Sequence, residues 1–93
     1  MTNETSATPD DIRAWLFSWF EGRGVKLARM DAELQSNFFE AGWIDSIQVI
    51  ALISELEGCF GVRFNDAHFQ DRGFPTIAGL AAIVAGLRRT GST

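Results

Sequence analysis

The sequence contains one cysteine, Cys59, and one histidine, His68, among its 93 residues. A single cysteine cannot build an intramolecular disulfide framework, and these two residues together cannot form a Cys-rich metal site. A thiol with no partner suits a reducing compartment, which predicts a cytoplasmic protein. We therefore expect Cys59 to be packed or inert, and His68 to be an ordinary surface histidine.

Long apolar runs are absent. The most apolar stretch, residues 77–87, contains two glycines and is shorter than the roughly 20 residues that a membrane-spanning helix needs. Residues 1–7 have neither the basic start nor the apolar run of a secretory signal. The sequence therefore predicts no membrane span and no export.

Basic residues are scarce in the middle of the chain. Residues 31–71 contain eight acidic residues and one basic residue, Arg63, which gives this segment a net charge of −7. Nucleic-acid binding needs a basic surface, so no nucleic-acid partner is predicted. The acidic middle suits protein partners with basic docking patches, and it equally suits a solvated surface that only maintains solubility.

The length allows one domain and leaves little room for a deep substrate cleft. With 46% apolar residues, including eight Phe and three Trp, the chain can build one core. We expect the domain to cover residues 8–89, with mobile Ser/Thr-rich tails at residues 1–7 and 90–93. These limits favour a binding or carrying module, acting as a monomer, over an autonomous enzyme.

Apolar residues at helical spacing predict a first and a last helix. The first begins after Thr8 as N-cap, with Pro9 at its first position, and ends near Gly22. The last begins after Thr76 as N-cap and closes with Arg88 near its C-terminal end. The expected inner faces are Ile12, Trp15, Leu16, Trp19 and Phe20 in the first helix, and Ile77, Leu80, Ile83, Val84 and Leu87 in the last.

A second main helix is predicted over residues 46–60, with Asp45 as N-cap and Gln48 placed for a capping box. A short helical turn is predicted over residues 66–71, after Asn65. Residues 22–44 form a long connection in which Trp43 is expected to pack against the helices. The fold class is therefore an all-α four-helix bundle, with three main helices, one short third helix and a long first loop. The expected inner face of the second main helix is Val49, Leu52, Ile53, Leu56 and Phe60.

Ser46 is the candidate functional residue. It follows the predicted N-cap, so its hydroxyl lies at a helix start where backbone N–H groups lack partners. A phosphodiester on that oxygen would sit in the positive field of the helix terminus. Gly42 allows the preceding loop to turn tightly, and Ile47 is expected to be exposed beside the serine. An Asp-Ser pair is also a common plain cap, so these features by themselves do not define a modification.

Residues 38–47 read Phe-Phe-Glu-Ala-Gly-Trp-Ile-Asp-Ser-Ile. This stretch resembles the signature of acyl and peptidyl carrier proteins, in which a glycine and apolar residues precede Asp-Ser-aliphatic. The similarity continues through Glu55-Leu56-Glu57 and through residues 74–80, and it covers roughly residues 10–88.

The resemblance implies a carrier-protein bundle with 4′-phosphopantetheine attached to Ser46 and with Asp45 supporting the serine. A phosphopantetheinyl transferase would supply the group from coenzyme A. The arm's thiol would hold an acyl or aminoacyl group as a thioester, loaded by an activating ligase or an acyltransferase and passed to a downstream synthase or transferase. The chain itself would not be an enzyme. The residues expected to meet these partners are Ile47, Gln48, Ala51, Ser54 and Glu55.

The outer face of the second main helix departs from fatty-acid-synthase carriers, which usually show more acidic residues there. Gln48, Ala51 and Ser54 are neutral. This favours a specialised role in polyketide, nonribosomal peptide or aminoacyl-transfer chemistry, and the motif resembles carriers of the D-alanyl or amino-acid type. Two alternatives stay open: a helical adaptor of the same fold without the prosthetic group, and a small hydrolase that uses Ser46 with His68.

Overall fold

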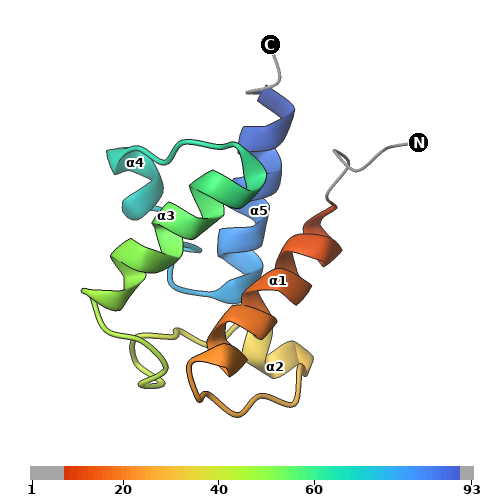
Figure 1. Ribbon diagram of the computed structural model, residues 1–93, viewed down its shortest axis with the longest axis vertical. Coiled ribbons are helices and arrows are strands. Elements are labelled where there is room, and N and C mark those ends of the chain that lie inside the picture. The colour runs from red at the N-terminus through yellow and green to blue at the C-terminus, as the bar shows by residue number, and fades with distance from the viewer. Residues whose placement is uncertain (1–7, 91–93) are drawn as a thin grey trace.

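The computed structural model describes residues 8–90, and in this range it consists of helices joined by turns, without strands (Figure 1). The helices are α1 (Pro9–Gly22), α2 (Asp31–Leu34), α3 (Gln48–Phe60), α4 (Asp66–Phe69) and α5 (Ile77–Thr90). The predicted all-α fold is confirmed, with three long helices and a short helix before the last. No helix within residues 8–90 has the length and apolar character needed to cross a bilayer.

Several helix boundaries differ from the prediction, and α4 ends at Phe69 and not at residue 71. The first connection is not a simple loop, because it contains the helical turn α2, and four residues are too few to produce a readable periodicity. The last helix includes Thr90, which was predicted to begin the C-terminal tail. The predicted tails at residues 1–7 and 91–93 lie outside the described residues.

Helix α1 begins as predicted. The Thr8 hydroxyl accepts a hydrogen bond from the Asp11 N–H, and the Asp11 carboxylate accepts one from the Thr8 N–H, each at 3.1 Å. This reciprocal capping box satisfies two backbone donors that the helix itself leaves unpaired. Pro9 occupies the start of the helix, where its missing N–H costs nothing.

The inner face of α1 is shifted slightly from the predicted one. Phe17 is buried, whereas Trp15 and Trp19 are only partly buried and lie at the edge of the core. Trp15 packs edge-on against Phe60 of α3, with ring centroids 5.7 Å apart. The indole rings of Trp15 and Trp19 are therefore covered by neighbouring residues over only part of their surface. The other buried residues of α1 are Ile12, Leu16 and Phe20, as predicted.

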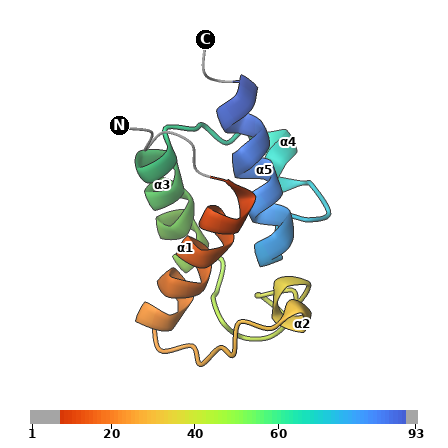
Figure 2. The ribbon, with the colours of Figure 1, turned by 90° about the vertical axis from the view of Figure 1, so that its right-hand side faces the viewer.

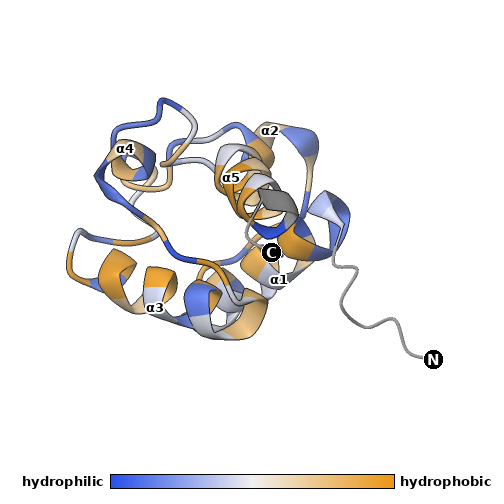
Figure 3. Cartoon of the chain, turned by 90° about the horizontal axis from the view of Figure 1, so that it is seen from above, coloured by the Kyte–Doolittle hydropathy of each residue, from blue (hydrophilic) through white to orange (hydrophobic). Residues whose placement is uncertain are grey.

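The core lies among the three long helices. Helices α1 and α5 pack along each other, while α3 covers the remaining side (Figures 1 and 2). Apolar stretches are visible in all three helices when the molecule is seen from above (Figure 3). Helical spacing predicted most buried positions of α3 and α5; Phe60, Ile83 and Leu87 are only partly buried, and Ala81 and Ala85 complete the α5 face. The predicted residues that are buried in these two helices are Val49, Leu52, Ile53, Leu56, Ile77, Leu80 and Val84.

The one cysteine lies in the last turn of α3, and the one histidine lies in α4. Gly61 ends α3 in a left-handed conformation, and Arg88 donates a hydrogen bond to the Phe60 carbonyl at 2.6 Å. Cys59 is exposed on the last turn of α3, so it is not packed, and its expected inertness stays a prediction. His68 helps to cap α4, because its Nδ1 accepts a hydrogen bond from the Asn65 N–H at 3.0 Å.

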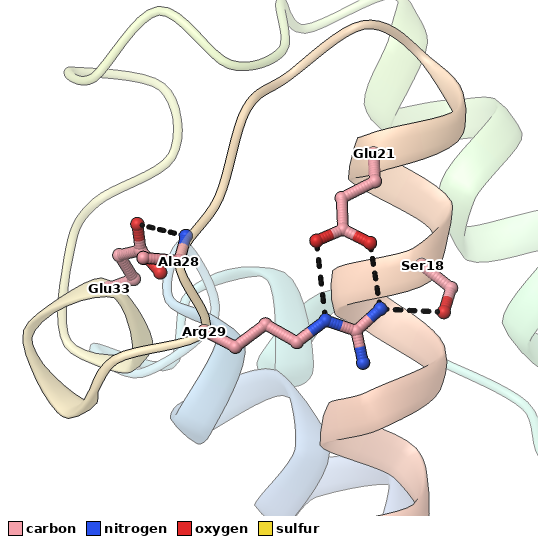
Figure 4. A network of polar contacts seen from close by, with 5 residues as sticks. All are labelled: Ser18, Glu21, Ala28, Arg29 and Glu33. Atoms are coloured by element: carbon pink, nitrogen blue, oxygen red, sulfur yellow. Dashed lines mark hydrogen bonds and ion pairs between the residues drawn. The ribbon is translucent and has the colours of Figure 1, made fainter.

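The connection after α1 is tied down by a polar network (Figure 4). Arg29 adopts a positive φ of 59°, which is uncommon for a residue other than glycine. Its guanidinium donates two hydrogen bonds to the Glu21 carboxylate, at 2.7 and 3.2 Å, and a third to the Ser18 hydroxyl at 3.1 Å. On the other side of Arg29, the Glu33 carboxylate accepts hydrogen bonds from the N–H groups of Ala28 and Met30, both at 3.0 Å. Two carboxylates therefore hold this turn against α1 and α2.

This network should weaken in acid. Hydrogen bonds from Arg29 lower the pKa of Glu21, and hydrogen bonds from the Ala28 and Met30 N–H groups lower the pKa of Glu33, both from an ordinary 4.5. A carboxyl group whose pKa is lower in the folded state stabilises that state above the unfolded pKa, and this stabilisation is lost as the pH falls through the folded pKa. The free energy of unfolding should therefore decrease as the pH falls below about 4.5. Denaturant titrations of the wild type and Glu33→Gln should show a shallower decrease in the variant; parallel curves would contradict this role of Glu33.

The start of α5 depends on a close approach between two glycines. The Thr76 side chain caps the helix by accepting the Gly79 N–H at 3.0 Å and donating to the Gly73 carbonyl at 3.0 Å. A Cβ atom on Gly79 would lie 2.1 Å from that same carbonyl oxygen. Only glycine lets the turn before α5 lie this close to the helix.

Gly79→Ala should therefore destabilise the fold by about 1–3 kcal/mol, because backbone atoms must move to relieve the overlap. Gly58→Ala is the matched control, since Gly58 also lies within a helix but has no atom within 4 Å of the added Cβ. The control should gain about 0.5–1 kcal/mol from the better helix propensity of alanine. Urea denaturation measures both changes, and equal effects of the two substitutions would argue against the proposed clash.

Candidate functional site

Phe38 anchors the second half of the connection to the core. Its side chain is fully buried, and its ring centroid lies 5.4 Å from that of Phe20 in α1. Its backbone N–H donates to the Pro75 carbonyl at 2.8 Å, which joins the connection to the segment that leads into α5. The Trp43 ring packs edge-on against that of Phe20, with centroids 5.7 Å apart, and the Trp43 backbone N–H donates to the Phe38 carbonyl. The interpretation of Trp43 as a packing residue is therefore confirmed.

A tight turn carries the chain from Phe38 towards α3. The Asn37 side chain accepts hydrogen bonds from the N–H groups of Phe39 and Glu40, at 2.9 and 3.0 Å. Gly42 has a positive φ of 78°, and a Cβ there would meet no atom within 4 Å, so the requirement for glycine is conformational. Ile44 follows the turn and is buried, which fixes the backbone immediately before the candidate site.

Asp45 caps the start of α3. Its Oδ1 accepts hydrogen bonds from the Ile47 N–H at 3.0 Å and the Gln48 N–H at 2.7 Å. In return, the Asp45 N–H donates to the Gln48 side chain at 3.3 Å, and the Asp45 carbonyl accepts from the Val49 N–H at 3.1 Å. This is the predicted capping box. The regular helix begins at Gln48, two residues later than predicted, because residues 46 and 47 form a turn that the cap holds in place.

Ser46 is exposed within this capped turn, between the buried residues Ile44 and Val49. These two anchors and the Asp45 cap fix the backbone on both sides of the exposed Ser46. A covalently attached phosphodiester fits here, because the hydroxyl is accessible and its backbone is held by side chains that do not cover it.

One expectation about the helix terminus is wrong. The N–H groups of Ile47 and Gln48 are not available to a phosphate, because the Asp45 carboxylate already accepts from both. That carboxylate also carries a negative charge beside the serine, which opposes any attraction of an anion to the terminus. The start of α3 is thus suited to displaying a group bonded to Ser46 and is poorly suited to binding a free phosphate.

The predicted partner residues fall on different sides of α3. Ile47 is 78% exposed and Ile50 is 66% exposed, so two aliphatic side chains lie in solvent close to Ser46. Gln48 and Glu55 instead line a shallow groove of about 580 Å³, formed with the C-terminal part of α1. Ala51 is partly buried and Ser54 is exposed. Ile50 was not predicted as a surface residue, although its helical position opposite the buried face of α3 would have identified it.

The arrangement does not support a Ser46–His68 pair. Because His68 Nδ1 accepts a hydrogen bond, the neutral ring carries its proton on Nε2, which leaves no nitrogen free to accept the proton of a serine. Within the described part of the chain, no group of three or more His, Cys, Asp or Glu side chains could hold a metal ion. The His68 tautomer therefore argues against a hydrolytic Ser46–His68 pair.

Residues 24–84 match a family model described as the phosphopantetheine attachment site. The matched region runs from the connection after α1 to within α5 and includes the capped turn at Asp45 and Ser46.

The chain belongs to the phosphopantetheine-attachment family. Its members hold 4′-phosphopantetheine covalently, so this chain is a phosphopantetheine-bearing carrier protein, of a class that is generally non-catalytic and that works with transferases and synthases. No significant match was found among curated proteins or among solved structures.

The role of Asp45 in the carrier can be tested by separating its hydrogen bonds from its charge. Asp45→Ala should cost about 1 kcal/mol of stability through loss of the cap. It should also slow modification by a phosphopantetheinyl transferase, because the turn that holds the serine loosens. Asp45→Asn keeps a capping oxygen without the charge, so its stability and modification rate should stay near those of the wild type. Thermal unfolding and timed mass spectrometry measure both effects; an Asn variant as slow as the Ala variant would show that the charge matters more than the cap.

Proposed function

We propose that Ser46 is the attachment point and that the chain presents an acyl or aminoacyl group, held as a thioester on the arm, to partner enzymes. The observation that supports this most directly is the exposed hydroxyl on a capped turn inside the matched region. The other serines of that region are less suitable. The Ser36 hydroxyl donates to the Ala32 carbonyl at 2.9 Å, and Ser54 lies within regular helix, away from any helix start.

In the proposed modification, Ser46 Oγ attacks the phosphorus that bears the pantetheine in coenzyme A. One O–P bond forms, the pyrophosphate O–P bond breaks with release of adenosine 3′,5′-bisphosphate, and the serine proton passes to a base on the transferase. Asp45 contributes by holding the turn through the Ile47 and Gln48 N–H groups, so that Ser46 approaches in one orientation. The attached thiol supplies the thioester chemistry, and the flexible tether raises the effective concentration of the cargo at several active sites.

The partners are proposed to dock around Ser46. Ile47 and Ile50 offer an apolar contact. Further along α3, Ala51 and Ser54 add small neutral side chains. A transferase, a loading ligase or acyltransferase, and a downstream synthase or transferase would use this surface in turn. Because Gln48, Ala51 and Ser54 are neutral, we propose a specialised polyketide, nonribosomal peptide or aminoacyl-transfer pathway. A cytoplasmic monomer is consistent with the lone cysteine and the small size.

The attachment can be tested by incubating the protein with coenzyme A and a broad-specificity phosphopantetheinyl transferase. Intact-mass spectrometry should show the addition of one phosphopantetheine. Ser46→Ala should abolish the addition, because no hydroxyl remains on the capped turn, while Ser36→Ala, which alters a serine of the matched region outside the docking surface, should leave it unchanged.

Two results would contradict the proposal. Modification that persists in Ser46→Ala would place the arm on another residue. No mass gain with several transferases, in a protein whose circular dichroism shows the helical fold, would favour the unmodified adaptor.

A further inference from the structure

The groove beside α3 has a mixed lining. Trp19 forms its aromatic wall, and the Arg23 guanidinium lies over that indole, 4.3 Å from the ring centroid. Gln48 and Glu55 line the opposite side, two helical turns apart, with Ser18 and Gly22 completing the surface. A planar ring, an amide and a carboxylate therefore line the same open groove.

The Glu55 carboxylate makes only a weak ion pair in this groove. Its carboxylate is about half exposed, and Arg23 lies 3.7 Å away, a separation longer than a hydrogen bond. An exposed ion pair of this kind contributes little and is readily exchanged for another. Arg23 also stacks on Trp19, so the carboxylate can accept a second cation without disrupting the guanidinium.

The surrounding charge favours a cationic ligand. Residues 31–71 carry a net charge of −7, and α3 lies within this segment. Over longer range this charge attracts an ammonium group more than a further carboxylate, whereas within the groove the ammonium competes with Arg23 for Glu55. A neutral aliphatic ligand would gain nothing from Glu55.

The arm on Ser46 is long enough to deliver such a group. Ser46 and Glu55 are separated by about 14 Å along the helix, whose diameter is about 10–12 Å. A fully extended chain spans about 3.3–3.6 Å for every three bonds. The phosphopantetheine arm has about 14 bonds between Ser46 Oγ and the thiol sulfur, so it reaches about 16 Å when extended. An attached aminoacyl group extends the reach by several more bonds, which brings its ammonium within range of Glu55.

We propose that this groove receives the aminoacyl cargo of the carrier, with the Glu55 carboxylate pairing with the cargo's α-ammonium group and Trp19 and Gln48 contacting the adjoining part of the arm. The inference rests on the proposed attachment at Ser46. It assigns the carrier a preference for amino acids over simple acyl groups as cargo, and it gives Glu55 the role of recognising the amine.

The test compares two forms of the holo-protein that differ only in the amine. A transferase installs alanyl-pantetheine or propionyl-pantetheine on Ser46 from the corresponding coenzyme A analogues, each with an amide in place of the thioester. In ¹H–¹⁵N spectra, the alanyl form should shift the Trp19 indole N–H and the Gln48 side-chain amide relative to the propionyl form. The difference should shrink as salt is raised, because an exposed ion pair is screened.

Matched variants identify the group responsible. Glu55→Gln should abolish the difference between the two cargoes, while Glu40→Gln, which removes the same charge from an exposed position outside the groove, should retain it. Identical Trp19 and Gln48 signals in the two wild-type forms would overturn the groove proposal, and so would a difference that persists in Glu55→Gln. Failure to load either analogue is seen first by mass spectrometry and would refute the attachment at Ser46, which separates the two proposals.

Discussion

Burial of Phe38 is the constraint on which the presentation of Ser46 depends. Its ring packs against Phe20, and its N–H is bonded to the Pro75 carbonyl, so α1, the connection and the approach to α5 meet at one residue. Ile44 is then drawn into the same core before α3 begins. Because buried apolar side chains fix the chain on both sides, the short capped turn between them is held at the surface. The exposure of Ser46 is thus a consequence of core packing around it.

The Asp45 cap decides what kind of site this surface turn can be. At many helix starts, free N–H groups attract anions, but here a carboxylate of the chain itself accepts from two of them. A phosphate attached to Ser46 would gain little from the helix terminus and would remain solvated. That property suits a carrier, because a phosphate that the helix terminus does not bind leaves the arm free to pivot between the carrier's own surface and partner enzymes.

The two flanks of α3 offer different chemistry at short range from the same serine. Ile47 and Ile50 present an apolar surface, while Gln48 and Glu55 line a polar groove against α1. In the proposed function, partner enzymes use the first flank and an aminoacyl cargo uses the second. This division would let the carrier hold its cargo against its own surface without covering the contacts by which enzymes recognise it.

The sequence by itself determined the helices that bear the site. The caps at Thr8, Asp45 and Asn65 and the periodic apolar faces act between residues three or four positions apart, so they can be read directly from the chain. The candidate site was likewise predictable from a contiguous stretch of residues. The helical turn α2 was missed because its four residues are too few to show a periodicity. Only the tertiary structure decided the groove and the half-buried tryptophans of α1. These features arise where segments distant in sequence meet, and neither local hydrogen bonding nor periodicity contains information about that meeting.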